Sequence, residues 1–164
     1  MKKIYFIKNK CENQRIDLGI EYITKSLEQI GYDSISVIDL DEFVNYRNYD
    51  GHKIYVGTLE NDSYISWLIE EELLIFHTKE PDSEGFYMES CPSDLTVICG
   101  GDDVGALYGC LELSERITKE EEMPRELAYG DSPVYKLRGP AVGLQKTKVE
   151  PPRLTYEYPI TMER

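Results

Sequence analysis

Apolar and polar positions follow two different periods along the first 117 residues, which predicts strands and helices in turn. Residues 2–8 are rich in β-branched and aromatic side chains and predict a first strand. Aliphatic side chains then recur every three or four residues, on one face of a helix: Ile16, Ile20, Ile23, Leu27 and Ile30. Gly31 follows where a left-handed helix end costs least. The chain is therefore expected to open with a strand and an amphipathic helix.

The next segments predict two more strands and a second helix. Residues 34–40 and 53–57 read as short extended segments. Residues 61–63, Asn-Asp-Ser, offer side-chain oxygens to the first amides of a helix, each such cap being worth about 1 kcal/mol. Apolar positions recur behind them at helical spacing: Ile65, Ile69, Leu73 and Phe76. The glutamates at 70–72 lie off this stripe, so we expect them to be solvated.

The third part of the pattern is a hairpin followed by a helix. Residues 85–90 and 95–100 flank Cys-Pro-Ser-Asp, a composition suited to an antiparallel turn. Asp102 and Asp103 then precede a helix over residues 104–117. Because the hairpin does not have to follow the earlier crossovers, the sheet is expected to be mixed. We predict an α/β fold, an α+β sandwich whose mixed β-sheet carries two or three helices mainly on one face, over residues 1–125.

Residues 126–164 differ in character from the rest. Most of the chain's prolines fall in the last 32 residues: Pro133, Pro140, Pro151, Pro152 and Pro159. No helix runs through such a segment, and a structureless stretch of this length is uncommon inside a compact domain. We therefore expect a linker and the start of a further part of the protein, beyond Arg164.

Length and charge limit the class of protein. A chain of 164 residues with 41% hydrophobic and 30% charged residues has room for one globular domain with a buried core. Its formal net charge of −13 repels phosphate backbones and anionic lipids. We expect no nucleic-acid partner and no membrane partner.

The first residues are too short an apolar stretch for an export signal. Ile4 to Ile7 are flanked by lysines, whereas the apolar core of a signal peptide has about 7–15 residues. If Met1 is the natural start, we expect the protein in the cytoplasm.

Cysteine and histidine spacing indicates neither a metal nor a cofactor. Cys11, Cys91, Cys99 and Cys110 form no C-x-x-C pair, and His52 and His77 have no ligand neighbours at metal-site spacing. Cys99 and Cys110 fall in a predicted strand and helix, where a cysteine is a small buried hydrophobe. We expect no bound metal and no cofactor.

The Gly-rich run over residues 100–109, between a strand and a helix, could be a phosphate-binding loop or a structural turn. Gly100 and Gly105 have the separation of the glycines in G-x-x-x-x-G-K-[ST], but Ala106 and Leu107 replace the lysine and the hydroxyl. Two aspartates at the helix start would also repel an anion and instead complement the helix dipole. We interpret the run as a structural turn, with Gly105 and Gly109 allowing a close approach of helix and sheet.

No arrangement of residues predicts catalysis within this chain. The paired carboxylates, among them Asp39 and Asp41, are adjacent in sequence rather than set across a substrate, and are read as caps and solvated faces. No serine or cysteine lies in a nucleophile-elbow pattern. The 13 tyrosines and Trp67 could line an interface or stack on sugars, although half-buried packing explains most of them.

Residues 85–117 carry a resemblance to a known family. Their order of hairpin, strand-terminal glycine, Asp-Asp and Gly-Ala-Leu-Tyr-Gly resembles the small domain preceding the barrel in glycoside hydrolase family 20 hexosaminidases and in α-glucuronidases. The resemblance implies a non-catalytic N-terminal accessory domain over residues 1–125. It also implies that residues 126–164 are a linker and the start of a missing (β/α)8 catalytic barrel, which would be the domain's partner. Carbohydrate would then be bound through the parent enzyme.

The same resemblance supplies one candidate for substrate binding. In those enzymes the first barrel strand begins with an Arg-Gly pair whose arginine contacts the terminal sugar, and Arg138-Gly139 occupies that place here. Residues 140–145 do not continue with the Asp-x-x-Arg of the hexosaminidase strand. Arg138 is thus the only site residue that the resemblance implies.

Two other interpretations stay open at this point. The chain could be a stand-alone acidic protein-interaction module whose tyrosine-rich surface binds a partner. It could also be a nucleotide-binding domain, which predicts affinity for ATP or NAD and against which Asp102 and Asp103 argue.

Overall fold

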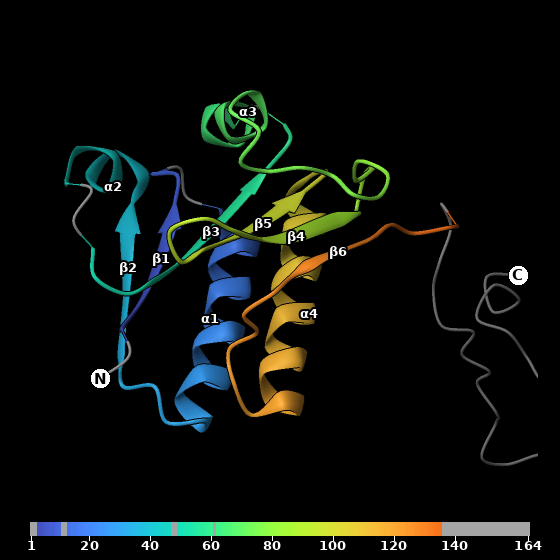
Figure 1. Cartoon of the computed structure of the whole chain (residues 1–164). Coiled ribbons are helices and arrows are strands. Elements are labelled where there is room, and N and C mark those ends of the chain that lie inside the picture. Colours follow the sequence, from blue (N-terminus) through green and yellow to red (C-terminus); the bar gives the residue numbers. More distant parts are fainter. Residues whose placement is uncertain (1–2, 11–12, 47–48, 61, 136–164) are drawn as a thin grey trace, which may run out of the picture. The chain divides into compact units, whose positions relative to one another are not determined.

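The computed structural model describes residues 3–10, 13–46, 49–60 and 62–135, which form an α/β domain with a six-stranded mixed sheet and four helices packed against it (Figure 1). The elements are β1 (Lys3–Lys8), α1 (Gln14–Gln29), β2 (Ser34–Asp39), α2 (Leu40–Tyr46), β3 (His52–Thr58), α3 (Ser63–Glu70), β4 (Phe86–Cys91), β5 (Leu95–Gly100), α4 (Asp103–Glu120) and β6 (Ala128–Asp131). The fold class predicted from the sequence is confirmed.

The sheet has the strand order β2-β1-β3-β5-β4-β6. The four strands β2, β1, β3 and β5 are parallel, whereas β4 pairs antiparallel with both β5 and β6. Lys8 pairs with Asp39, and Thr58 pairs with Gly100, so the carboxyl ends of the parallel strands share one edge of the sheet. The predicted hairpin is the β4–β5 pair.

The two long helices, α1 and α4, lie side by side on one face of the sheet (Figure 1). Their apolar stripes and alternate strand residues bury one core cluster, which includes Phe6, Ile23, Ile54, Ile98 and Leu113. At the helix contact a Cβ on Gly19 would come within 2.7 Å of the Cβ of Cys110, so only glycine permits this approach. The Oγ atoms of Ser26 and Ser114 are hydrogen-bonded at 2.7 Å in the same contact.

The opposite face of the sheet is covered by shorter elements. Strand residues that alternate with the first set bury a second cluster with α3 and the segment after it: Ile7, Tyr55, Ile65, Leu68, Leu74, Tyr87, Cys91, Leu95, Val97 and Cys99. Leu40 and Phe43, at the start of α2, pack against this cluster. Two helices therefore lie mainly on one face, as predicted, and two short ones complete the other.

The helix α3 ends earlier than its apolar spacing suggests. The apolar positions continue to Phe76, but α3 stops at Glu70, and the amides of Leu73 and Leu74 both donate to the Leu68 carbonyl. Glu72 adopts φ 55°, which turns the chain out of the helix. Phe76 stays partly buried against Tyr87, with ring centroids 5.1 Å apart. The apolar spacing correctly indicated that Leu73 and Phe76 are at least partly buried. It did not predict that a turn, and not a helix, places them there.

The first compact unit spans Met1–Pro133, and Val134–Arg164 form a second unit. The first unit extends past residue 125 because β6 pairs with β4. Within the described part of the chain, no helix is long and apolar enough to cross a bilayer.

Candidate functional site

The Gly-rich run places Asp102 as the N-cap of α4. Its Oδ1 accepts a hydrogen bond from the Gly105 amide at 2.8 Å. Its Oδ2 accepts from the Ser83 hydroxyl at 2.7 Å and from the Glu84 amide at 3.0 Å. The carboxylate therefore joins the start of the helix to the loop before β4, which confirms its predicted capping role.

The glycines of this run pack against the same loop. The Gly101 amide donates to the Gly85 carbonyl at 2.9 Å. A Cβ on Gly105 would come within 1.9 Å of the Gly85 carbonyl oxygen, and one on Gly101 within 2.0 Å of the Asp82 oxygen. The amides at this helix start thus face the protein's own backbone and a carboxylate, which is the arrangement of a structural turn.

Asp103, the second aspartate, faces the other long helix. Its Oδ2 lies 2.6 Å from Nη1 of Arg15, near the start of α1. Both side chains are exposed, and an exposed ion pair contributes about 0–1 kcal/mol. Neither Asp102 nor Asp103 lines either of the two pockets described below.

The described thiols are protonated at neutral pH. Burial raises the pKa of Cys91 and of Cys99 to about 12, and burial also raises the pKa of Cys110. A nucleophilic cysteine needs a thiolate, so these three residues are packing groups, as was predicted for Cys99 and Cys110. Cys11 lies outside the described residues.

Asp62 forms a buried polar cluster with Tyr55. The Tyr55 hydroxyl lies 2.9 and 2.7 Å from the two oxygens of the Asp62 carboxylate, and Oδ1 also accepts from the amides of Tyr64 and Ile65. Both side chains are buried, and burial together with the Asp62 charge raises the pKa of Tyr55. The sequence predicted Asp62 as a cap but not its contact with Tyr55, because the two lie on different elements.

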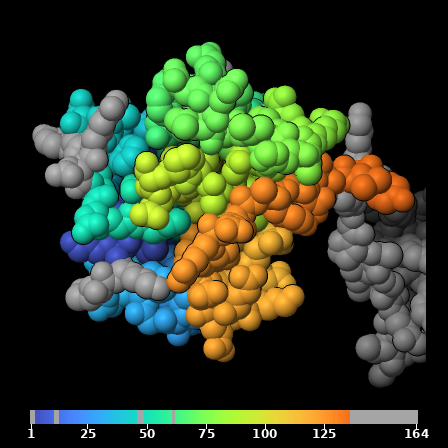
Figure 2. All heavy atoms as spheres, in the orientation of Figure 1, coloured from blue at the N-terminus to red at the C-terminus, as the bar shows by residue number. Residues whose placement is uncertain are grey.

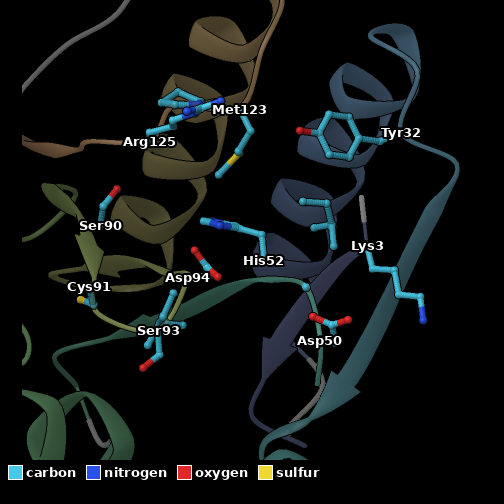
Figure 3. Close-up of a pocket in the computed structure, with 14 residues that line it drawn as sticks. Lys3, Tyr32, Asp50, His52, Ser90, Cys91, Ser93, Asp94, Met123 and Arg125 are labelled. Carbon is cyan, nitrogen blue, oxygen red and sulfur yellow. The ribbon is translucent and has the colours of Figure 1, made fainter. Parts of the chain in front are cut away.

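A pocket of 740 Å³ lies at the amino ends of the parallel strands. Segments far apart in the sequence meet there, and the teal, lime and orange regions that contain them adjoin on the face shown in Figure 2. Figure 3 shows His52 in the middle of the pocket, with Asp94 below it, Arg125 on one side and Tyr32 on the other. The charged lining residues are Lys3, Asp50, Asp94 and Arg125. Two basic and two acidic side chains give this pocket no strong preference for an ion of either sign.

His52, like Cys91, lines this pocket and has a pKa that burial shifts. Its Nε2 lies 2.8 Å from Oγ1 of the buried Thr96. Burial lowers the pKa of His52, an effect that the Asp94 carboxylate partly opposes. His77 lies elsewhere, with Nε2 3.4 Å from Oε1 of Glu89. The two histidines therefore do not form a common site.

The lowered pKa of His52 predicts a loss of stability in mild acid. An unfolded histidine, with a pKa of about 6.5, binds its proton before the folded one does, so the free energy of unfolding falls as the pH drops below that value. Above a pH of about 6.5, His52 is neutral in both the folded and the unfolded state and does not change the free energy of unfolding. Urea unfolding between pH 7.5 and 5.5 should show this slope, and His52→Gln, which keeps a polar nitrogen beside Thr96, should reduce it. An unchanged slope in the variant would assign the pH dependence to other groups.

A second pocket, of 430 Å³, lies at the carboxyl ends of β1 and β3. From β1 the chain continues to β2 on one side of the sheet and then crosses to β3 on the other side, so a topological switch point lies between β1 and β3. Ligands of open α/β sheets bind at such switch points. Lys8, Lys10, Asp41 and Glu60 are among its lining residues, and Lys8 forms an ion pair with Asp17. Among the described residues no group of three or more His, Cys, Asp or Glu side chains could hold a metal ion.

Trp67 differs from its predicted environment. It was expected to be half-buried, but 43% of its surface is exposed. Position 67 lies two residues from Ile65 and two from Ile69, and therefore on the opposite face of the helix from that stripe. The spacing of the apolar residues therefore already indicated that Trp67 lies on the exposed face of the helix. Arg138, the predicted substrate contact, lies outside the described residues.

Comparisons with known proteins show a likeness in fold. No family model matches the sequence, and no curated protein does. Among solved structures, a GH138 enzyme targeting pectin rhamnogalacturonan II matches with a TM-score of 0.60 and 23% identity, over 96% of this chain and 19% of that one. The chain is thus similar in fold to a small part of this glycoside hydrolase.

Two further structures of glycoside hydrolases are similar to this chain in fold. The GH115 4-O-methyl-α-glucuronidase BtGH115A matches with a TM-score of 0.50 and 16% identity, over 79% of this chain and 17% of that one. CpGH84D matches with a TM-score of 0.51 and 12% identity, over 77% of this chain and 19% of that one. This chain spans less than a fifth of the length of each of the three proteins.

Proposed function

We propose that this chain is the non-catalytic N-terminal accessory domain of a glycoside hydrolase and supports a (β/α)8 catalytic barrel. The observation that carries the proposal is the GH138 match, which covers nearly all of this chain and a small part of a much larger enzyme. The resemblance of residues 85–117 to the domain that precedes the barrel in family 20 hexosaminidases and α-glucuronidases supports the same function.

The length of the match supports the proposed role of the last residues. The first compact unit ends at Pro133, so a match over 96% of the 164 residues includes part of the segment after it. Because Ala128–Asp131 form β6 of this domain's sheet, we interpret the residues after Pro133 as a linker and the start of the barrel. Arg138 is then a substrate contact at the beginning of the first barrel strand, and carbohydrate is the ligand of the parent enzyme.

The described side chains support a non-catalytic domain. Hydrolysis of a glycosidic bond uses two carboxyl groups about 5–10 Å apart across the substrate. Here Asp62 and Asp102 cap helices, and Asp103 and Asp17 form ion pairs. These four carboxylates therefore have structural partners.

An activity assay tests the proposal. The purified 164-residue chain, supplied with nitrophenyl glycosides of N-acetylhexosamines, glucuronic acid and rhamnose, is expected to release no nitrophenol above the enzyme-free background. Its far-UV circular dichroism spectrum confirms that the assayed sample is folded. Turnover at rates of about 1 s⁻¹ or more, typical of enzymes, would overturn the proposal.

The alternative is a stand-alone acidic interaction module, which the exposed Trp67 favours. The two functions differ in what the gene encodes after Arg164. Eight alternating strand and helix patterns there support the accessory domain, whereas a stop codon in the next few positions supports the independent module. The parent's sugar specificity, hexosaminidase-like or α-glucuronidase-like, can then be measured on the longer protein.

A further inference from the structure

Five aromatic rings form a continuous row on the α2–α3 side of the sheet. We call this set, Tyr5, Tyr49, Phe43, Tyr64 and Trp67, the aromatic row. Successive ring centroids are 5.0, 6.0, 6.5 and 5.4 Å apart. Its members come from β1, α2, α3 and the segment between α2 and β3, so the fold and not the local sequence brings them together.

The aromatic row is accessible. Four of its side chains are partly exposed, and Trp67 exposes 43% of its surface. Val44, next to Phe43 in α2, is 43% exposed as well. Tryptophan and tyrosine are enriched among the residues that dominate protein–protein binding energy, because they bury much apolar area with few rotatable bonds.

The other face of the domain has a different character. The exposed surface of α1 and α4 carries the ion pairs Lys25–Glu21, Arg116–Glu112 and Arg15–Asp103. It also carries a cation–π contact between Lys25 and Tyr22. Figure 1 shows α2 and α3 on the opposite side of the sheet from α1 and α4. The α1–α4 face also exposes the single apolar side chains Leu18, Tyr22 and Tyr108, whereas the aromatic row joins its rings in one continuous set.

We propose that the aromatic row is the surface through which this domain docks on the catalytic barrel of its own enzyme. The inference rests on the proposed function and adds which face forms the contact. The length comparison favours this occupant, because the GH138 match leaves about four-fifths of that enzyme outside the matched region. A domain joined by a linker to so large a body meets it at a high effective concentration.

Charge defines the chemistry of the partner surface. The helices that supply the row, α2 (Leu-Asp-Glu-Phe-Val-Asn-Tyr) and α3 (Ser-Tyr-Ile-Ser-Trp-Leu-Ile-Glu), contain Asp41, Glu42 and Glu70 and no lysine or arginine. Glu42 accepts a hydrogen bond from the Tyr49 hydroxyl at 3.1 Å, at the row itself. Complementary interfaces place opposite charges around an apolar centre. The barrel surface is therefore expected to present lysine and arginine around an apolar patch.

The ring angles favour a protein over a sugar. A saccharide stacks on ring faces that lie in one plane, but successive rings of the row are inclined by 58°, 25°, 85° and 21°. Trp67 lies nearly parallel to Tyr64 at 5.4 Å, so the two rings cover part of each other. Protein side chains of mixed shape fill such an uneven surface.

Hydroxyl-radical footprinting of the longer enzyme and of the 164-residue chain tests the inference. Trp67 reports on the row, and Tyr22, which is 45% exposed on α1, is the matched control. In the longer enzyme, Trp67 should be oxidised at least tenfold more slowly than in the 164-residue chain. The rate for Tyr22 should change less than twofold.

Each other outcome overturns the inference in a distinguishable way. Slower oxidation of Tyr22 instead of Trp67 would place the contact on the α1 face and leave the proposed function intact, and unchanged rates at both residues would show that neither face docks. If Trp67 is oxidised slowly in the 164-residue chain as well, and sedimentation shows that this chain is a dimer, the aromatic row would be the contact with a second copy. Protection of Trp67 by rhamnogalacturonan II oligosaccharides would assign it to sugar. A gene without a barrel would remove the proposed function itself.

A substitution gives an independent measurement. In the longer enzyme, Trp67→Ala should speed limited proteolysis within residues 134–164 at least tenfold, because an undocked domain leaves its linker accessible. Tyr22→Ala should change the rate less than twofold. Urea unfolding of both variants of the 164-residue chain shows whether the domain itself remains folded. Equal proteolysis of the two variants in folded protein would contradict the docking.

Discussion

Replacing Asp62 with alanine is expected to lower the domain's free energy of unfolding by about 4 kcal/mol, because a lost cap costs about 1 kcal/mol and each buried polar group left without a partner about 1–3 kcal/mol. The carboxylate accepts from the Tyr55 hydroxyl and from the amides of Tyr64 and Ile65, and both acid and phenol are buried. Domains are typically stable by about 5–15 kcal/mol, so this one change removes a large fraction of the total. Urea unfolding followed by circular dichroism measures it.

Tyr55→Phe is the matched control for Asp62→Ala. It removes the hydroxyl but keeps the aromatic packing and leaves the Asp62 carboxylate with two amide donors. The expected loss is about 2 kcal/mol, the size of one hydrogen bond to a charged group. If Asp62→Ala cost less than Tyr55→Phe, the capping bonds would contribute nothing and the assignment of Asp62 as the centre of this cluster would be wrong.

The elements that the sequence predicted are those whose signals are local. The stripe from Ile16 to Ile30 defines α1, and Gly31 adopts the left-handed φ of 89° expected after its end. Asp62 and Asp102 cap their helices because a cap is a contact within three residues. Such signals need no knowledge of the rest of the chain.

What the sequence could not predict depends on contacts between distant segments. The early end of α3 depends on Leu73 and Leu74 turning back to the Leu68 carbonyl, and an apolar spacing does not distinguish a helix from a turn that buries the same residues. The first pocket brings together His52, at the start of β3, and Asp94, in the turn between β4 and β5. The aromatic row likewise contains residues from four segments that are apart in the sequence. The helical spacing could therefore indicate only that Trp67 lies on the exposed face of α3.

Replacing Gly105 with alanine is the second change expected to have a large effect, a loss of about 3 kcal/mol in the free energy of unfolding, at the upper end of the usual cost of overpacking. The added Cβ would come within 1.9 Å of the Gly85 carbonyl oxygen, and backbone cannot move aside as a flexible side chain can. Alanine gains about 1 kcal/mol of helix propensity over glycine, so a stabilised variant is what propensity alone predicts. The sign of the measured change therefore decides whether contact with the loop or helix propensity dominates at this position.

Gly31→Ala separates this collision from backbone strain. Nothing lies within 4 Å of a Cβ at Gly31, so its cost comes only from the left-handed conformation, about 1 kcal/mol. A loss at Gly105 well above the loss at Gly31 would show that the start of α4 is held against the loop before β4 by direct backbone contact. The same contact explains why this helix start, with its two glycines and two aspartates, is closed by protein groups: the Asp102 carboxylate takes the Gly105 amide, and the Gly85 carbonyl takes the Gly101 amide. An ATP or NAD phosphate would have to displace both of these hydrogen bonds.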